Sequence, residues 1–530
     1  MNFFSRISKN KSIGFAAALL SGSYFLSAVL GLLRDRLLAA NFGLNSGVLD
    51  AYWAAFSIPD LLYYFLVTGA LSVTFIPVFV ERMQNNNKTS AWELSSSVIN
   101  LMAIVTFVGS ILVFVFAGLL MHAIAPGFNQ ERHDLATALM RIVAINPFIF
   151  SISTVLGAMQ QASGRFFFFA ISPIIYNFGI ILGIIFFTPH LGIIGAALGV
   201  ALGSLLQLMV HVVGMIGLGF EYKPKIFWQN KGFKQVLRLI LPRSLDQGID
   251  AINSMVERFI ASFLGFGAIT SYAYAYNLQA QPIVLIGVAI ATASFPSITK
   301  RAASSRIDLF RKEIRDVLGS ILWFALPASV IAFLLRGYLV RLYLGQGSEV
   351  IAAALGWFTG AIIFRALFHA LTRAYYAQQD TKTPLYISFF AIGLNIALAF
   401  LFVDRFDNSI SGLAFAQSAV AAIESIILLL ILHFRLGGII TRKLIYAGFK
   451  IMFATFIMAV ATYGMVRFVF PLQVADVGFF TMAPKFIAIL LVSGISYIIA
   501  SSIAGLNEAK LFISTAKRWF FKPLNLSDFR

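Results

Sequence analysis

The sequence predicts an all-α polytopic membrane protein with about fourteen transmembrane helices. Three observations predict this fold class: the composition, the alternation of long apolar blocks with short polar breaks, and an internal repeat. Hydrophobic residues make up 59% of the 530 residues and charged residues only 12%. As a helix, an apolar block of about 20 residues is long enough to cross a hydrocarbon core of about 30 Å.

The individual helices are predicted from the apolar blocks in chain order, with boundaries good to about four residues. The expected spans are 13–40, 51–81, 93–122, 134–161, 167–188, 191–219, 236–264, 270–299, 312–340, 349–378, 384–403, 409–434, 444–470 and 480–504.

Lys and Arg collect in every second polar break. The basic breaks hold Arg6, Lys9 and Lys11; Arg82 and Lys88; Arg165; Lys223, Lys225, Lys231 and Lys234; Lys300, Arg301, Arg306, Arg311 and Lys312; Lys382; Arg435, Arg442 and Lys443; and Lys510, Lys517, Arg518, Lys522 and Arg530. Three of the alternate breaks, at 41–50, 188–191 and 264–270, hold none. Because basic loops stay on the cytoplasmic side, both termini are expected to be cytoplasmic.

The net charge of +18 lies mostly in these loops. Anionic lipid headgroups account for such a charge, so a nucleic-acid partner is not expected. The chain has no cysteine, and its six histidines show no HExxH-like spacing. No loop is long enough for a soluble catalytic domain, and no cleavable signal peptide is evident. The sequence therefore favours a transporter over an enzyme, with no cofactor and no confident metal site.

Several motifs recur about 218 residues apart, in the same order. The matched pairs are Pro77 with Pro296, Gln160 with Gln378, Asn177 with Asn395, and Gly195 with Gly412. Asp35-Arg36 similarly matches Glu257-Arg258. Six spans separate the copies, so two parallel six-helix repeats are expected to form N and C lobes, with two further C-terminal helices and a substrate path between the halves.

This repeat sets the expected domain boundaries. The expected domains are an N-lobe at 1–219, a cytoplasmic linker at 220–235, a C-lobe at 236–435, two C-terminal helices at 436–504 and a basic cytoplasmic tail at 505–530.

Polar residues inside the spans are the candidate site. A charge at mid-bilayer costs roughly 2.5–3.5 kcal/mol, so such residues face a bundle interior or a wet cavity. The candidates are Arg34, Asp35, Arg36, Asp50, Asp60, Arg243, Glu257, Arg258, Asn277, Arg365 and Arg373. Arg365, His369 and Arg373 share one helix face by their spacing. Surplus arginine in a cavity suits an anion with phosphate oxygens, which guanidinium binds bidentately.

Two plainer roles compete with substrate binding. Asp35 and Arg36 could pair with Glu257 and Arg258 as a buried strut, since buried ions are normally paired. Arg243 and Arg373 lie near cytoplasmic helix ends, where arginine commonly snorkels to the interface. Arg34 is then the cation left over beside a charge pair.

Several stretches resemble the MurJ/MviN lipid II flippases. They include Leu30 to Asp35, Asp50 to Tyr52, Ile58 to Leu62, Phe75 to Pro77, and Arg373 to Pro384. The resemblance covers nearly the whole chain and implies the multidrug/oligosaccharidyl-lipid/polysaccharide exporter fold. It also implies that undecaprenyl-pyrophosphate-linked peptidoglycan precursor, lipid II, moves by alternating access from the inner to the outer leaflet of the bacterial cytoplasmic (inner) membrane. Membrane lipids and the cell-wall synthesis machinery are the other partners implied.

The chain departs from this family at several positions. Cavity arginines of typical members fall on Ala28, Tyr63 and Asn277. Some members are thought to bind sodium through an acid and an Asn, which match Glu257 and Asn395 here, and these two are the weak sodium candidates. The second acid of those members falls on Ala399, whose side chain cannot bind a cation. The alternative interpretation is an exporter of another lipid-linked oligosaccharide, or of a drug, within the same superfamily.

Overall fold

The computed structural model describes residues 13–68, 74–84, 87–303, 306–407, 409–473, 476 and 478–521, and within these ranges it leaves undescribed the side chains of 13–18, Thr68, 241–250 and 516–521. Within these ranges all regular structure is helical. The chain divides into two compact units, Met1–Thr270 and Ser271–Arg530, and each is described by itself.

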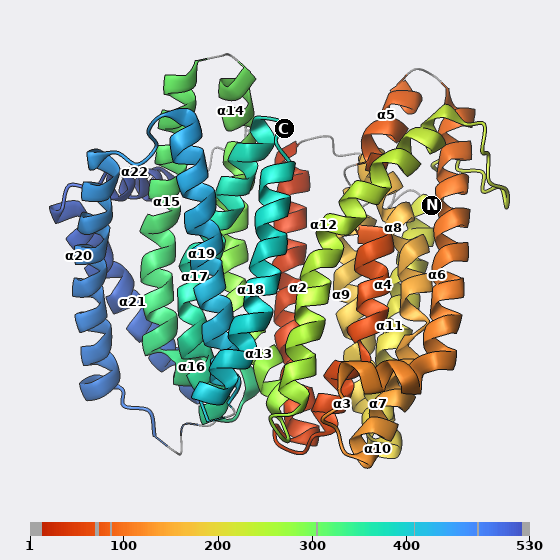
Figure 1. Ribbon diagram of the computed structural model, residues 1–530, viewed down its shortest axis with the longest axis horizontal. Coiled ribbons are helices and arrows are strands. Elements are labelled where there is room, and N and C mark those ends of the chain that lie inside the picture. Colours follow the sequence, from red (N-terminus) through yellow and green to blue (C-terminus); the bar gives the residue numbers. More distant parts are fainter. Residues whose placement is uncertain are drawn as a thin grey trace. The chain divides into compact units, whose positions relative to one another are not determined.

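Unit 1 consists of helices of very different lengths (Figure 1). They are α2 (Ile13–Phe42), α3 (Val48–Ala55), α4 (Ser57–Tyr63), η1 (Tyr64–Thr68), α5 (Ile76–Gln84), α6 (Lys88–Ile124), α7 (Gln130–Val143), α8 (Asn146–Ala162), α9 (Phe166–Leu182), η3 (Gly183–Phe187), α10 (Thr188–Leu191), α11 (Ile193–Met215) and α12 (Lys231–Ser262). Helix α12 packs within this unit, against α4, η1, α5 and α6.

Unit 2 begins inside α13 (Ala268–Pro282). Its further elements are η4 (Ile283–Val288), α14 (Ala289–Ala303), α15 (Ile307–Leu334), α16 (Arg336–Leu344), α17 (Glu349–Ala377), α18 (Lys382–Arg405), α19 (Ile410–Leu436), α20 (Arg442–Gly464), η5 (Met465–Val469), α21 (Phe479–Ile503) and α22 (Asn507–Phe521). Helix α17 packs against α15 and α19, while α20 packs against α15 and α21.

Eleven helices in the described residues are long and apolar enough to cross a membrane. They correspond to eleven of the expected spans. The spans expected at 13–40, 51–81 and 236–264 are not among them, so the count of fourteen is not confirmed. The second of these is broken into α3, α4, η1 and α5, with residues 69–73 outside the described part.

Three helices begin about five residues before the expected spans. They are α6, α12 and α15, which start at Lys88, Lys231 and Ile307. Asn87 and Asn230 accept hydrogen bonds from backbone N–H groups of the first turns of α6 and α12. Such caps satisfy donors that a helix start leaves without partners. Hydropathy detects only the part of a helix that lies in the membrane, and these three helices extend beyond it, two of them with capped first turns.

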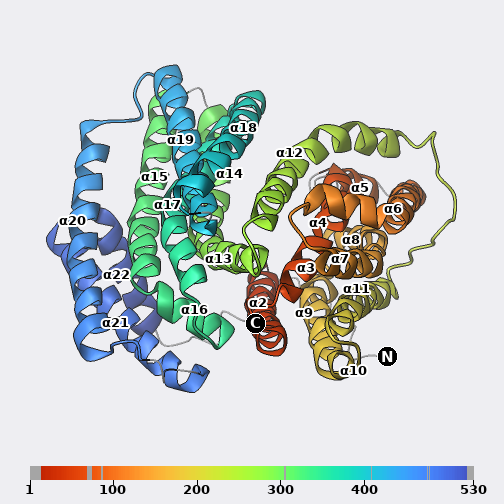
Figure 2. The same ribbon diagram turned by 60° about the horizontal axis from the view of Figure 1, so that its bottom comes forward.

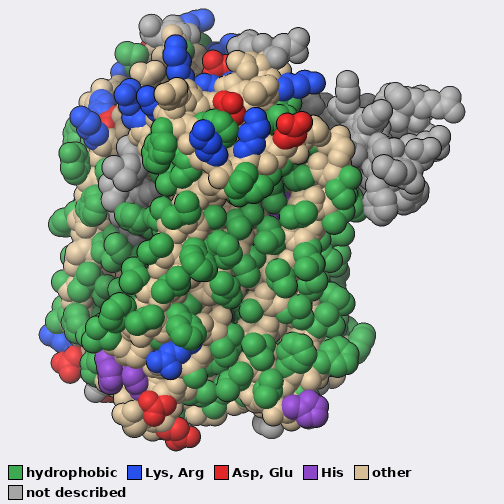
Figure 3. Space-filling model, turned by 90° about the vertical axis from the view of Figure 1, so that its right-hand side faces the viewer, with side chains coloured by type: hydrophobic (Ala, Val, Ile, Leu, Met, Phe, Trp, Pro, Cys, Tyr) green, Lys and Arg blue, Asp and Glu red, His purple; other side chains and the backbone are tan. Residues whose placement is uncertain are grey.

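One face of the molecule shows the pattern of a membrane protein. Hydrophobic side chains form a broad belt in Figure 3, and Lys and Arg gather at one end of it. On α6 the belt includes exposed side chains from Ile104, 54% exposed, to Leu119, 70% exposed. Contiguous exposed apolar surface of this extent requires an apolar surrounding, which a bilayer supplies.

Two π-helical segments occupy equivalent places in the sequence repeat. Tyr64, the first residue of η1, and Ile283, the first of η4, are separated by the same interval as Pro77 and Pro296. Single-turn π-helical segments are rare and occur frequently at functional sites. Their recurrence at one repeat position supports the internal repeat from backbone geometry, independently of the sequence motifs.

Close glycine contacts hold α9 and η3 against α11. A Cβ built on Gly179 would collide with the backbone of Gly203, and one on Gly183 with the backbone of Gly199. Small residues at four-residue spacing let two helix backbones approach, which is how membrane helices gain packing energy without a hydrophobic driving force.

Candidate functional site

Arg34 lies at the centre of a polar cluster in unit 1. Its Nε donates to Asp35 Oδ1 over 2.8 Å, and its Nη1 donates to Asn177 Oδ1 over 3.2 Å. Asn177 in turn donates to the hydroxyl of Ser27 and to the carbonyl of Pro173. The cluster therefore joins α2 to α9, and the Arg34 side chain remains 22% exposed.

A second group of polar side chains lies on α3, α4 and α12. Arg258 Nη1 donates to Ser57 Oγ over 2.8 Å, and Arg258 also interacts electrostatically with Asp60. Tyr52 and Tyr176 each lie near both Arg34 and Asp60. Unit 1 thus places Arg34 and Asp60, two of the expected site residues, near the same two tyrosines, and a third, Arg258, near Asp60.

The buried strut expected between Asp35-Arg36 and Glu257-Arg258 is not formed. Asp35 pairs with Arg34, and Glu257 accepts a hydrogen bond from Asn253 over 2.9 Å. Arg36 makes no hydrogen bond or ion pair within the described residues. The cation left over in α2 is therefore Arg36, whereas the sequence interpretation assigned that role to Arg34.

Asp50 has a structural role in unit 1. Its carboxylate accepts hydrogen bonds from the backbone of Gly267 and from the backbone and hydroxyl of Thr270, at 2.6–2.8 Å. Arg132 lies 3.9 Å away, and the Asp50 side chain has no exposed surface. Asp50 therefore fastens α3 to the turn between α12 and α13, and none of its contacts joins it to Arg34.

In unit 2 the polar site is built around Glu424. Arg365 Nη1 lies 3.1 Å from Glu424 Oε2, and Ser388 donates to Glu424 Oε1 over 2.8 Å. Helices α17, α18 and α19 thus meet at one buried carboxylate, which is 2% exposed. Glu424 is not among the residues expected from the sequence, although an acid within an apolar run is a visible signal of a polar site.

The other expected residues of unit 2 are less closely linked. The Arg373 guanidinium lies 5.9 Å above the ring of Phe295, a cation–π contact between α17 and α14. Asn277 is half-buried on α13, and Asn395 is buried on α18. The side chain of Arg243 lies outside the described part of the chain.

Tyr63 occupies one position where the resembling family carries arginine. Its hydroxyl lies 3.2 Å from the hydroxyl of Thr154 on α8. Tyr63 thus makes a neutral hydrogen bond at a position where the resemblance leads us to expect a cation. Within the described residues no group of three or more His, Cys, Asp or Glu side chains could hold a metal ion.

Comparison with known proteins decides the family. The family described as lipid II flippase MurJ matches residues 38–483. This chain belongs to the lipid II flippase MurJ family. A relative from Haemophilus influenzae, named probable lipid II flippase MurJ, is 29% identical over 76% of this chain and 83% of its own. One of the same name from Buchnera aphidicola subsp. Acyrthosiphon pisum is 27% identical over 92% and 96%.

Solved structures agree with the family and the fold. A structure of lipid II flippase MurJ in an inward closed conformation superposes with a TM-score of 0.76 at 26% identity, covering 92% of this chain and 98% of that one. An inward-facing multidrug resistance transporter of the MATE family, in the MOP superfamily, gives a TM-score of 0.67 at 16% identity, over 78% and 95%. The second match shows the fold alone.

Proposed function

We propose that this chain flips lipid II from the inner to the outer leaflet of the bacterial cytoplasmic membrane by alternating access. Its membership of the lipid II flippase MurJ family over residues 38–483 carries this proposal. Eleven apolar helices of spanning length support a multi-pass transporter embedded in that membrane. The proposed domains are lobes at 1–219 and 236–435, joined by a linker at 220–235 and followed by helices at 436–504 and a tail at 505–530.

Arg34 is the proposed contact for the pyrophosphate of the substrate. A guanidinium has five N–H donors, and the contacts to Asp35 and Asn177 use three of them. Two donors remain on a side chain that is partly exposed, beside a partner that fixes its orientation. Arg36 and Arg258 would add positive charge to the same region. Preorganised arginine suits phosphate oxygens because the bidentate geometry adds both energy and selectivity.

The proposed orientation places both termini and the basic loops in the cytoplasm. The chain contains no cysteine, so single cysteines can report the orientation directly. Trp228→Cys should be shielded from a membrane-impermeant maleimide in intact spheroplasts and labelled after lysis. Asp134→Cys, whose side chain is 67% exposed, should be labelled in both samples. The reverse pattern would contradict the orientation.

Rescue of bacteria depleted of their own lipid II flippase tests the function. Expression of this chain should restore growth and restore lipid II to the outer leaflet, detected by a probe that cannot cross the membrane. A matched strain would express Arg34→Ala at equal membrane abundance. Growth without lipid II in the outer leaflet would count against lipid II as the cargo and would favour another lipid-linked oligosaccharide.

A further inference from the structure

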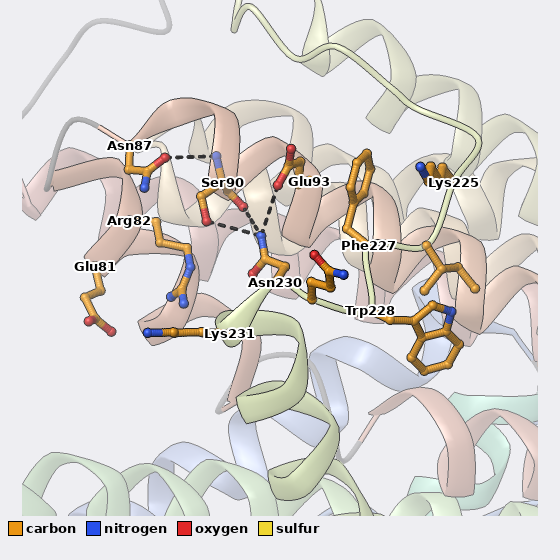
Figure 4. A pocket seen from close by; sticks show the side chains of 12 residues that line it. Glu81, Arg82, Asn87, Ser90, Glu93, Lys225, Phe227, Trp228, Asn230 and Lys231 are labelled. Atoms are coloured by element: carbon orange, nitrogen blue, oxygen red, sulfur yellow. Dashed lines mark hydrogen bonds between the residues drawn. The ribbon is translucent and has the colours of Figure 1, made fainter.

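A polar pocket lies in unit 1 apart from the Arg34 cluster (Figure 4). Its volume is about 780 Å³, and its walls are the end of α5, the first turns of α6 and the segment 225–231. Figure 4 shows Arg82 and Lys231 at one end and Lys225 with Trp228 at the other, with Asn230 between them. A pocket of this size is large enough for a small-molecule ligand.

The wall formed by the segment between α11 and α12 is fixed by side chains of α6. Asn100 donates to the carbonyls of Lys223 and Lys225, and Ser97 accepts from the backbone N–H of Phe227. Asn230 donates to both the carbonyl and the hydroxyl of Ser90. Figure 2 shows this segment passing around the outside of unit 1. The pocket therefore has a preorganised wall, although the sequence suggested only a polar linker.

The end of the pocket at Glu93 lies beyond the level of the lipid headgroups. The exposed apolar belt of α6 begins at Ile104, and Glu93, which lines the pocket, precedes it by about 16 Å of helix. The headgroup region adds only roughly 5–8 Å on each side of the hydrocarbon core. This end of the pocket, where Arg82 and Lys231 lie, consequently opens to water. That this water is the cytoplasm rests on the proposed function and its orientation.

The charges in the pocket favour an anion. Three cations, Arg82, Lys225 and Lys231, line it, with two acids, Glu81 and Glu93. Glu93 is engaged by Asn230 at 3.4 Å. Arg82 donates to the carbonyl of Val78 and lies against the backbone of Gly232.

Neither Arg82 nor Lys231 has an ion-pair partner within the described part of the chain. We propose that this pocket binds a soluble anion carrying a phosphate or diphosphate group, held between Arg82 and Lys231. Arginine supplies two parallel N–H donors to phosphate oxygens, and lysine supplies a point charge beside it. Such a ligand would join the end of α5 to the start of α12.

Inorganic pyrophosphate is the probe for this site. Calorimetric titration of the full-length protein in nanodiscs of phosphatidylcholine, at physiological salt, should give saturable binding. The double variant Arg82→Gln with Lys231→Gln should raise the Kd at least tenfold. Lys88→Gln with Lys234→Gln is the matched control, because both lysines are exposed, lie on α6 and α12 near the pocket, and do not line it. It should change the Kd less than twofold.

Three outcomes would overturn the proposal. They are no saturable binding to the wild type, equal losses in both double variants, and binding that disappears when phosphatidylglycerol is added to the nanodiscs. The last result would identify a lipid headgroup as the occupant.

Lipid II flipping by the Arg82→Gln, Lys231→Gln variant without pyrophosphate should equal that of the wild type. A wild-type protein that binds pyrophosphate without flipping lipid II would refute the proposed function and leave the pocket standing. One that flips lipid II without binding pyrophosphate would refute only the pocket.

Discussion

Arg365 on α17 and Glu424 on α19 form an ion pair, with 3.1 Å between Nη1 and Oε2. The two side chains differ in burial, since Glu424 is 2% exposed and Arg365 is 25% exposed. Ser388 on α18 also donates a hydrogen bond to this carboxylate. The pair therefore fixes three helices of unit 2 and holds the Arg365 guanidinium at the edge of a buried region.

Removing one partner of this pair should cost more than removing the charge from both. We expect Glu424→Gln to destabilise the protein by about 1–3 kcal/mol, because Arg365 loses its carboxylate in a partly buried place. Glu424→Gln combined with Arg365→Gln should recover part of that loss. Thermal unfolding in detergent, analysed as a double-mutant cycle, measures the coupling. Additive effects of the two substitutions would show that the pair contributes no coupling.

The substitution of Arg34 tests the substrate site. We expect Arg34→Ala to abolish most lipid II flipping, because the pyrophosphate loses a bidentate donor and Asp35 loses its partner. Arg34→Lys should recover only part of the activity, since lysine cannot form two parallel hydrogen bonds. Flipping is measured in proteoliposomes at equal protein density. Asp35→Asn is the control, because it removes the ion pair and keeps the Arg34 guanidinium. Full activity of Arg34→Ala would exclude Arg34 as the pyrophosphate contact.

The sequence predicted the fold better than it predicted side-chain partners. Apolar length and loop charge are properties of local stretches, so eleven expected spans have a counterpart among the apolar helices. Partners depend on tertiary contacts. The spacing of Arg365 grouped it with His369 and Arg373, but its carboxylate partner is 59 residues away in the chain. Asp50 was placed with the cavity residues because it is a charge beside an apolar span, and only the fold shows that Gly267 and Thr270 surround it.

The close approach of α9 and α11 predicts that a larger residue at Gly179 destabilises the protein more than the same residue at Gly393 does. Gly179→Leu should lower the melting temperature strongly, because its side chain would collide with the backbone of Gly203. Overpacking of this kind typically costs about 1–3 kcal/mol or more. Gly393→Leu on α18 is the control, since nothing lies within 4 Å of its Cβ position. Equal melting temperatures for the two variants would contradict the glycine contact.

Asp380, between α17 and α18, should stabilise the protein down to unusually low pH. Burial raises the pKa of its carboxyl, but hydrogen bonds from Thr383 and the charge of Arg435 outweigh it and hold the pKa at about 2. A lowered pKa means that the stabilisation is complete above the ordinary value of 3.8 and is lost as the pH falls through about 2.

Asp380→Asn should therefore lower the melting temperature at pH 7, and its deficit should shrink as the pH falls below about 3.8. The expected loss at pH 7 is about 1–2 kcal/mol, because an amide has one acceptor oxygen in place of two and loses the charge-assisted hydrogen bond from Arg435. Asp404→Asn, at the other end of α18, is the control, because that exposed carboxylate makes no hydrogen bond or ion pair within the described residues. A deficit independent of pH would show that the carboxyl charge is not the cause.

The energy source is expected to be the membrane potential. The proposed cargo carries about two negative charges on its pyrophosphate, and moving each through 100 mV is worth about 2.3 kcal/mol, so the potential supplies roughly 4–5 kcal/mol. Because the cell interior is negative, this drives an anion outward, which is the required direction. A strong sodium site is not expected, since Ala399 carries no carboxylate where some relatives have an acid. Flipping in proteoliposomes at a clamped potential, with sodium replaced by choline, should persist and should slow when the potential is collapsed. Activity that vanishes without sodium and ignores the potential would restore a sodium-coupled mechanism using Glu257 and Asn395.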